Sequence, residues 1–438
     1  MRREFIVGFG KVDITPPLSI PYLDFCPNRH NFFTGIHDTL YSRALYLSSG
    51  DEEAIIIATD TIGFSKSVLG EKRDFIKEIK EMIEEKTGVP QSNIMLTSSH
   101  IHSTPDTLNF RPLIKAPNAK EWLEDLQRRI ILSAETALNG RFMASLKVGS
   151  GEVNVSKNRR GEEFLDREVI VIIFESARRD KIFLVNFACH PVIVQAQNLV
   201  SADYVGVVEN KIEEFVSNTR GCIFLQGACG DINPICDDTR DFNDVYSIGI
   251  SIAGEIMKIY GEISISKSNH PIEPVILKVR SKEVGFPSRP LPSQAEIEEL
   301  IREKEEEEIK VKYVESENEK NQALKKICRI EDILARIEEG NGPFIGELQM
   351  IRVGNCILFG IPGEPFCELG MKIKAASKPF RGIPIGYANG YLGYIAPLSS
   401  WRKGGYEVSL GPWSKVGPEA FDKIIEVFHE LKENIIIQ

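Results

Sequence analysis

The chain has 438 residues, of which 42% are hydrophobic, and its 53 Lys+Arg against 63 Asp+Glu give a formal net charge of -10. No apolar run is long enough to span a bilayer, and a negative chain without a concentrated basic face argues against nucleic acid as a partner. The first residues lack the apolar segment of a secretory signal, so we expect a soluble cytoplasmic protein without integral membrane association.

From residue 53 onward the pattern predicts a β-α-β unit. The apolar run AIIIAT ends at Asp60, an amphipathic stretch follows with Phe75, Ile79 and Ile83 at helical spacing, and NIML then forms a second apolar run. A second helix is predicted over residues 119–138. These alternating elements indicate an α/β fold.

The middle of the chain continues the alternation. Strands are predicted for SLKVGSGEV, EVIVIIFE, KIFLVNFA and CIFLQG, and helices for residues 204–215 and 242–260. After residue 342, ELQMIRVGNCILFGIPGE resumes strand alternation, and PEAFDKIIEVFHEL predicts a final helix. We therefore predict a mixed β-sheet core flanked by helices.

A highly charged block interrupts this pattern. Residues 287–342 carry apolar side chains only at intervals, which predicts two antiparallel helices that leave most of their surface in solvent. We interpret 287–342 as a charged helical hairpin inserted into one catalytic domain made of 1–286 and 343–438. The simplest role for such a charge run is structural, or an interaction surface.

Eight cysteines are scattered along the chain without any CxxC pair. This spacing predicts reduced, mostly buried thiols, and it argues against a structural zinc held by cysteines. The positions are Cys26, Cys189, Cys222, Cys229, Cys236, Cys328, Cys356 and Cys367.

The chain has only seven histidines, and two of them, His100 and His102, follow the predicted strand NIML in SSHIHS. On an extended backbone, residues two apart project from the same face and can point at one ion or substrate. A pair of hydrogen-bonded surface histidines is the alternative. His190 follows another apolar strand in NFACHP, where a lone histidine is more often structural, but together with His100 it suggests a metal site. Cys189 is expected to be core packing.

Three further segments can contribute. The loop LQGACGDINP holds Asp231 and Asn233 among glycines that permit close backbone approach, although an ordinary tight turn has the same composition. Glu364 lies in a Pro-Gly turn, where it either caps the turn or adds a carboxylate to the histidine ligands. A glycine-rich stretch carries tyrosines that can line a pocket and donate protons: Tyr387, Tyr391, Tyr394 and Tyr406.

Taken in order, these motifs resemble those of the neutral ceramidases. The resemblance rests on GKVDITPP, SSHIHS, NFACHP with SADYVG, QGACGDINP, PGE and YANGYLGY with a later GGYE, and it covers most of residues 5–415 apart from the charged block. It implies one zinc held by two histidines, a glutamate and a tyrosine. The matching positions are His100, His190, Glu364 and Tyr394, with Tyr391 as the alternative tyrosine.

The resemblance also implies residues that contact the scissile amide. These are His102 and, in SKNRRG, Arg159, with Arg160 as the alternative arginine. Tyr406 joins Arg159 as a candidate to stabilise the oxyanion, and Asp231 and Asn233 lie in the corresponding loop. Two departures from the family pattern are expected: Asn233 stands where the family's loop has a serine, and we expect no C-terminal immunoglobulin-like domain of the kind that full-length ceramidases carry.

The sequence thus predicts a zinc-dependent hydrolase that cleaves an N-acyl amide bond with metal-activated water. The expected partner is a small-molecule N-acyl amide or lipid-like substrate, and a homo-oligomer is left open. Two alternatives remain. One is a metal-dependent esterase or phosphoesterase, and the other is a catalytically silent binding protein on the same fold.

Overall fold

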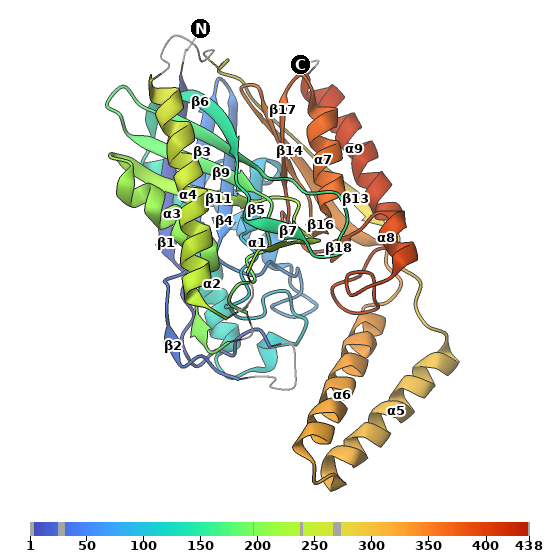
Figure 1. Ribbon diagram of the computed structural model, residues 1–438. Helices are drawn as coiled ribbons and strands as arrows, with labels where there is room; N and C mark the ends of the chain where they lie inside the picture. Colours follow the sequence, from blue (N-terminus) through green and yellow to red (C-terminus); the bar gives the residue numbers. More distant parts are fainter. Residues whose placement is uncertain (1–3, 25–30, 196, 237–239, 266–272, 437–438) are drawn as a thin grey trace.

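A large mixed sheet forms the centre of the computed structural model, which describes residues 4–24, 31–195, 197–236, 240–265 and 273–436 (Figure 1). Its strand order is β11-β9-β8-β6-β1-β3-β4-β5, with parallel pairing of β11 to β9 and of β4 to β5. The strands are β1 (Phe5–Asp13), β3 (Tyr41–Ser49), β4 (Glu52–Thr59), β5 (Ile94–Ser98), β6 (Phe142–Glu152), β8 (Glu168–Glu175), β9 (Lys181–Phe187) and β11 (Thr219–Gln226).

A second, four-stranded sheet packs on one face of the first. Its order is β13-β14-β15-β17, from β13 (Leu277–Phe286), β14 (Phe344–Val353), β15 (Cys356–Gly360) and β17 (Arg381–Ile385). One buried cluster joins the two sheets, since it contains Leu45 and Ile56 from the large sheet and Ile351 and Leu358 from the small one. Strands covered on both faces are expected to be continuously apolar, as AIIIAT is.

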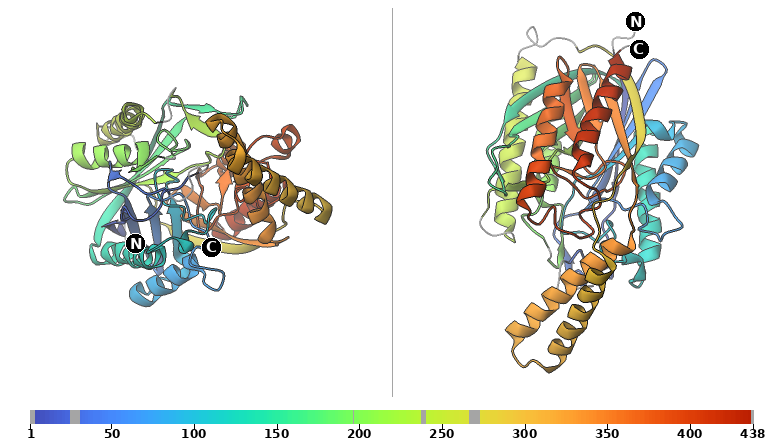
Figure 2. Two further views of the ribbon diagram at one scale, coloured as in Figure 1. Left: turned by 90° about the horizontal axis from the view of Figure 1, so that it is seen from below. Right: turned by 90° about the vertical axis from the view of Figure 1, so that its right-hand side faces the viewer.

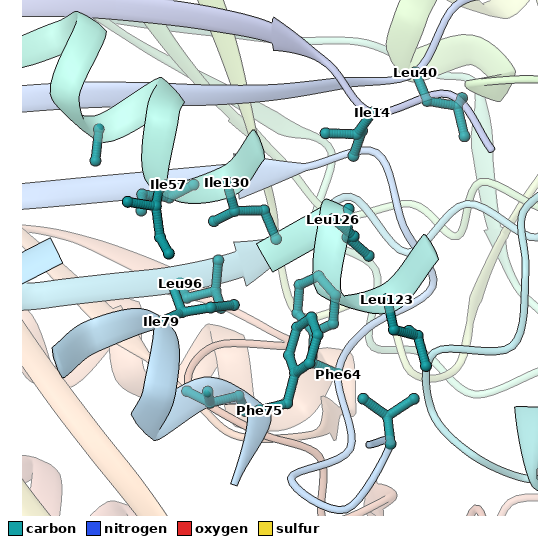
Figure 3. Packing of buried hydrophobic residues seen from close by; sticks show 14 of the residues in the cluster. Ile14, Leu40, Ile57, Phe64, Phe75, Ile79, Leu96, Leu123, Leu126 and Ile130 are labelled. Atoms are coloured by element: carbon teal, nitrogen blue, oxygen red, sulfur yellow. The ribbon is translucent and has the colours of Figure 1, made fainter. Parts of the chain in front are cut away.

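Helices cover the outer face of each sheet. The large sheet carries α1 (Phe75–Thr87), α2 (Ala119–Asn139), α3 (Asp203–Phe215) and α4 (Phe242–Ile265), and the small sheet carries α7 (Cys367–Ser377) and α9 (Glu419–Ile436). Figure 3 shows Phe75 and Ile79 of α1 and Ile130 of α2 packed with Ile57 and Leu96 of the sheet. The layers are therefore helix, sheet, sheet, helix. The predicted mixed sheet flanked by helices is confirmed, and the second sheet is an addition.

Short elements complete the chain. These are β2 (Gly35–Ile36), β7 (Ser156–Asn158), β10 (Leu199–Val200), β12 (Ile232–Pro234), β16 (Glu364–Pro365), β18 (Tyr394–Ile395), α8 (Leu398–Lys403) and two 3-10 turns, η1 (Gln91–Asn93) and η2 (Leu113–Lys115). Each of the described helices is too short or too polar to cross a bilayer.

The charged block folds as the predicted helical hairpin, with α5 (Gln294–Tyr313) and α6 (Glu317–Glu338). Ser293 caps α5 in a capping box with Glu296, which explains where the first helix begins. The hairpin projects from one end of the sheets, and both chain termini lie at the other end (Figures 1 and 2). The domain boundaries at 287 and 342 stay a prediction.

One cysteine departs from the expectation of reduced thiols. Cys328, in α6, is disulfide-bonded, so that expectation is wrong there, because spacing along a chain does not reveal which distant cysteines meet. Cys26 lies outside the described residues. The remaining cysteines are free thiols: Cys189, Cys222, Cys229, Cys236, Cys356 and Cys367.

Candidate metal centre

The candidate residues gather where strands of both sheets end. His100 follows β5, His190 follows β9, and Glu364 stands in β16, just after β15 of the small sheet. All three side chains are buried, at 1–2% exposure. The site therefore depends on the packing of the two sheets, because the histidines come from one and the carboxylate from the other.

The backbone conformation of His100 differs from the extended one that the sequence predicted. His100 has a left-handed backbone with φ 66°, which is strained for a residue with a side chain, and it lies beyond the last residue of β5. The expected extended H-x-H geometry is therefore wrong. The imidazoles nevertheless meet, with His102 Nε2 3.3 Å from His100 Nε2.

The second ring nitrogen of each candidate ligand is fixed by a backbone carbonyl. His100 Nδ1 lies 2.6 Å from Ile62 O, and His190 Nδ1 lies 2.7 Å from Cys229 O. Since a carbonyl oxygen only accepts, each Nδ1 must donate, and in the neutral ring Nε2 then carries a lone pair. Burial lowers the pKa of His190 to about 4, so that ring is neutral near pH 7.

Those lone pairs face an anion. Glu364 Oε2 lies 3.4 Å from His100 Nε2 and 3.3 Å from His190 Nε2. Burial favours the neutral acid, but His100 and His190 outweigh it and hold the pKa of Glu364 well below its usual range. That lowering requires protonated rings. With both Nε2 atoms unprotonated, His100 and His190 present only lone pairs to Glu364 Oε2, and these atoms repel one another unless a cation lies between them. Two imidazoles and a carboxylate are ligands that suit Zn²⁺.

A third histidine, His102, lies close enough to join the candidate metal ligands. The ligand nitrogens of His100, His102 and His190 lie within 4.8 Å of one another and can hold a metal ion together. Burial, followed by the neighbouring histidines, lowers the pKa of His102 well below its usual value. His102 is therefore a neutral imidazole near pH 7.

Two of the candidate tyrosines lie beside Glu364 in different ways. Tyr391 Oη donates to Glu364 Oε1 at 2.5 Å, on the oxygen that faces away from the paired histidines. Tyr394 is the direct strand partner of Glu364 in the β16–β18 pair, so both side chains leave the same face. Burial raises the pKa of both tyrosines well above the usual value, and the nearby Glu364 carboxylate adds to this effect. Tyr387 stacks on the His100 ring with centroids 3.9 Å apart.

Arg159 is the fixed cation of the site. Its Nε donates to Glu407 Oε1 at 2.8 Å, and its Nη2 donates to Gly230 O at 2.6 Å and to Tyr394 Oη at 3.2 Å. Its Nη1 lies 3.4 Å from Asn233 Oδ1. Such a network orients a guanidinium before any substrate arrives.

Two of the expected site residues, Asp231 and Arg160, bond to groups outside the candidate metal ligands. Asp231 accepts bonds from Cys367 N at 2.7 Å and from Asn158 Nδ2 at 2.7 Å, and burial raises its pKa to about 6. Asp231 thus links its own loop to the segments that carry Cys367 and Asn158. It is absent from the described residues that line the cavity. Arg160 bonds to Glu407 Oε2 at 2.6 Å and lines a neighbouring pocket, which it shares with Arg159 and Tyr406.

A cavity of about 270 Å³ opens onto this group. His100, His102, His190, Glu364, Arg159, Asn233, Tyr394 and Tyr406 all line it, and so does Gln195. Its apolar lining was not predicted and comes from five separate segments: Leu23, Ile62, Phe110, Val192 and Trp413. No periodic pattern marks these residues. The arrangement combines a site for a cation, a neutral imidazole, a fixed guanidinium and an apolar space for a small substrate.

We expect Glu364→Gln to weaken zinc binding by about 10- to 100-fold, because the amide keeps the size of the carboxylate but loses its charge. The measurement is zinc content after dialysis against a graded chelator, together with the melting temperature. A variant that unfolds but retains zinc in its folded fraction would support the turn-capping role instead.

Comparison with known proteins points to one family. A family model described as "Neutral/alkaline non-lysosomal ceramidase, N-terminal" matches residues 5–241. A neutral ceramidase of Mycobacterium tuberculosis is 29% identical over 82 residues, which is 17% of this chain and only 13% of that protein.

Solved structures resemble nearly the whole chain. A neutral ceramidase from Pseudomonas aeruginosa superposes with a TM-score of 0.73 at 20% identity, covering 98% of this chain and 75% of that one. A ceramidase complexed with C2 gives a TM-score of 0.73 at 19% identity, with the same coverage. At these identities the likeness establishes the shared fold.

Proposed function

The chain belongs to the neutral/alkaline non-lysosomal ceramidase family, and from that premise we propose that it is a zinc-dependent hydrolase of linear N-acyl amides. The observation that carries the proposal is the convergence of two imidazoles and a carboxylate in the wall of a cavity whose other side is apolar. His100, His190 and Glu364 would hold the ion, with Tyr394 or Tyr391 as the fourth ligand. A bound zinc lowers the pKa of a water molecule to about 7 and polarises a carbonyl group.

His102 is the proposed proton carrier. Its low pKa keeps the ring neutral, so that it can accept a proton near pH 7, and the same low pKa makes the protonated ring a strong acid. An amine is a poor leaving group that must be protonated as the C–N bond breaks. We assign that proton transfer to His102, which lies against His100 at the cavity wall.

Arg159 is the proposed stabiliser of the developing oxyanion. Its guanidinium is held by Glu407, Gly230 and Tyr394, so it needs no rearrangement when negative charge forms on the amide oxygen. Tyr406 lines the same cavity and adds a hydroxyl donor. Asn233 offers an amide group but no nucleophile, which is consistent with attack by water.

The decisive experiment compares three substrates on the zinc-loaded protein: a short soluble N-acyl amide, the matching ester, and ceramide in mixed micelles. We expect amide hydrolysis that stops on chelation and returns with zinc. Ester turnover without amide turnover would refute the reaction class and favour the esterase. The ratio of kcat/KM for ceramide to that for the soluble amide then decides the substrate, for which we propose a small N-acyl compound because the cavity is about 270 Å³.

A further inference from the structure

The C-terminal half of α6 contacts the apolar side of the cavity. Two aromatic residues, Phe110 and Trp413, form what we call the aromatic wall, with ring centroids 6.4 Å apart in an edge-to-face contact. They come from segments about three hundred residues apart in the sequence. Neither lies in a helix or strand of the sheets, so other contacts must fix their positions.

On the Phe110 side, the contact is an ion pair. Asp332 of α6 pairs with Arg111, and these side chains are only 8% and 16% exposed. Arg111 in turn donates through Nη1 to Phe110 O at 2.9 Å and through its backbone N to Asp106 Oδ2 at 2.7 Å. Asp332 thus holds the backbone that carries Phe110.

On the Trp413 side, α6 supplies two arginines. The Arg329 guanidinium lies 5.1 Å from the centre of the Trp413 ring, within the range of a cation–π contact. Arg336 is fully buried and donates through Nη2 to Lys415 O at 3.0 Å and to Ser288 Oγ at 2.6 Å. The loop after α8 that bears Trp413 is therefore held against α6, as Figure 1 shows.

The rest of the hairpin makes a different kind of contact. Lys326 of α6 pairs with Glu303 of α5 at 2.6 Å, and these side chains are 47% and 37% exposed. Such a pair joins the two helices to each other in solvent. The hairpin thus has a docked half, with Arg329, Asp332 and Arg336, and a projecting half that extends from the end of the sheets (Figure 2).

We infer that the docked half of α6 determines substrate specificity by positioning the aromatic wall, and so sets which acyl chains the cavity admits. This inference rests on the proposed function of the same cavity. The two rings line a space of only about 270 Å³, so a change in their positions alters the room for an acyl chain. The candidate metal ligands His100, His190 and Glu364 are held by contacts of their own, so the wall can move while the metal stays.

The test uses Asp332→Asn and Arg329→Gln, each of which removes one charge contact and keeps most of the side-chain volume. The matched control is Glu303→Gln, which breaks the exposed pair in the projecting half. Substrates are N-acyl amides of one amine with chains from acetyl to dodecanoyl. For Asp332→Asn and Arg329→Gln we expect the ratio of kcat/KM for the longest acyl chain to kcat/KM for the shortest to change by about tenfold, with zinc content unchanged. For the control we expect wild-type activity and the wild-type chain-length profile.

A binding measurement separates this inference from the proposed function. Calorimetric titration of the zinc-loaded protein with acetate, octanoate and decanoate needs no turnover, and the same shift in chain-length preference is expected there. An unchanged profile in either folded docked variant overturns the inference, as does an equal loss for every chain length, because that is a general structural defect. Failure of the wild type to bind decanoate more tightly than acetate also overturns it. Absence of amide hydrolysis with a shifted binding profile would refute only the proposed reaction.

Discussion

His100→Ala and His190→Ala are each expected to release the zinc and to lower kcat/KM by more than about 1,000-fold, equivalent to about 4 kcal/mol of transition-state stabilisation. Each substitution removes one of two imidazole nitrogens that face Glu364 Oε2 at 3.3–3.4 Å. With one nitrogen gone, the remaining donors leave an open coordination position that water must fill, and zinc affinity falls accordingly. The measurement is metal content per chain after gel filtration, followed by activity on an N-acyl amide.

The control for this experiment is His429→Ala. His429 lies on the exposed side of α9 and is absent from the described residues that line the cavity, so this variant should keep about one zinc per chain and full activity. The fold should survive in the site variants, because the backbone bond from His190 N to Ile232 O at 2.9 Å does not need the imidazole. Full zinc retention in both folded site variants would refute the proposed metal centre.

Arg159→Lys is expected to lower kcat by about 100- to 1,000-fold while zinc stays bound. Lysine keeps the positive charge but loses the planar fork, which here bonds to Glu407, Gly230 and Tyr394 at once. A residue that acts on the transition state should change kcat more than KM. Steady-state kinetics with metal analysis on the same sample measures both effects.

The neighbouring arginine provides the matched variant. Arg160 shares Glu407 with Arg159, yet its other bonds go to Glu162 and to backbone carbonyls such as Gly404 O at 2.8 Å, and it lines the adjacent pocket. We therefore expect a much smaller loss from Arg160→Lys. A larger loss there than from Arg159→Lys would transfer the assigned role to Arg160 and refute the assignment made above.

Local patterns in the sequence predicted most of the secondary structure. The β4-α1-β5 unit, the strands before His100 and His190, and the charged helical hairpin all follow from hydrophobic periodicity, which depends only on neighbours along the chain. The resemblance to the neutral ceramidases is likewise carried by short ordered motifs, and the family match over residues 5–241 agrees with it.

Features that depend on contacts between distant segments could not be predicted in the same way. The second sheet and the aromatic wall arise where segments far apart in sequence pack together. The left-handed backbone of His100 and the disulfide at Cys328 also had no signal in the local pattern. The apolar residues that line the cavity show no periodicity, because the lining takes one residue from each of several loops.

The sequence by itself determined which residue types were present for the chemistry: histidines after apolar strands, a glutamate in a Pro-Gly turn, and an arginine beside an asparagine. The tertiary structure decided how they meet. It turned the two Nδ1 atoms to backbone carbonyls, which left the Nε2 lone pairs facing Glu364, and it set the docked half of α6 against Phe110 and Trp413. The physical reason is that hydrogen-bond direction and burial are properties of the packed sheets, and no local stretch of the chain encodes them.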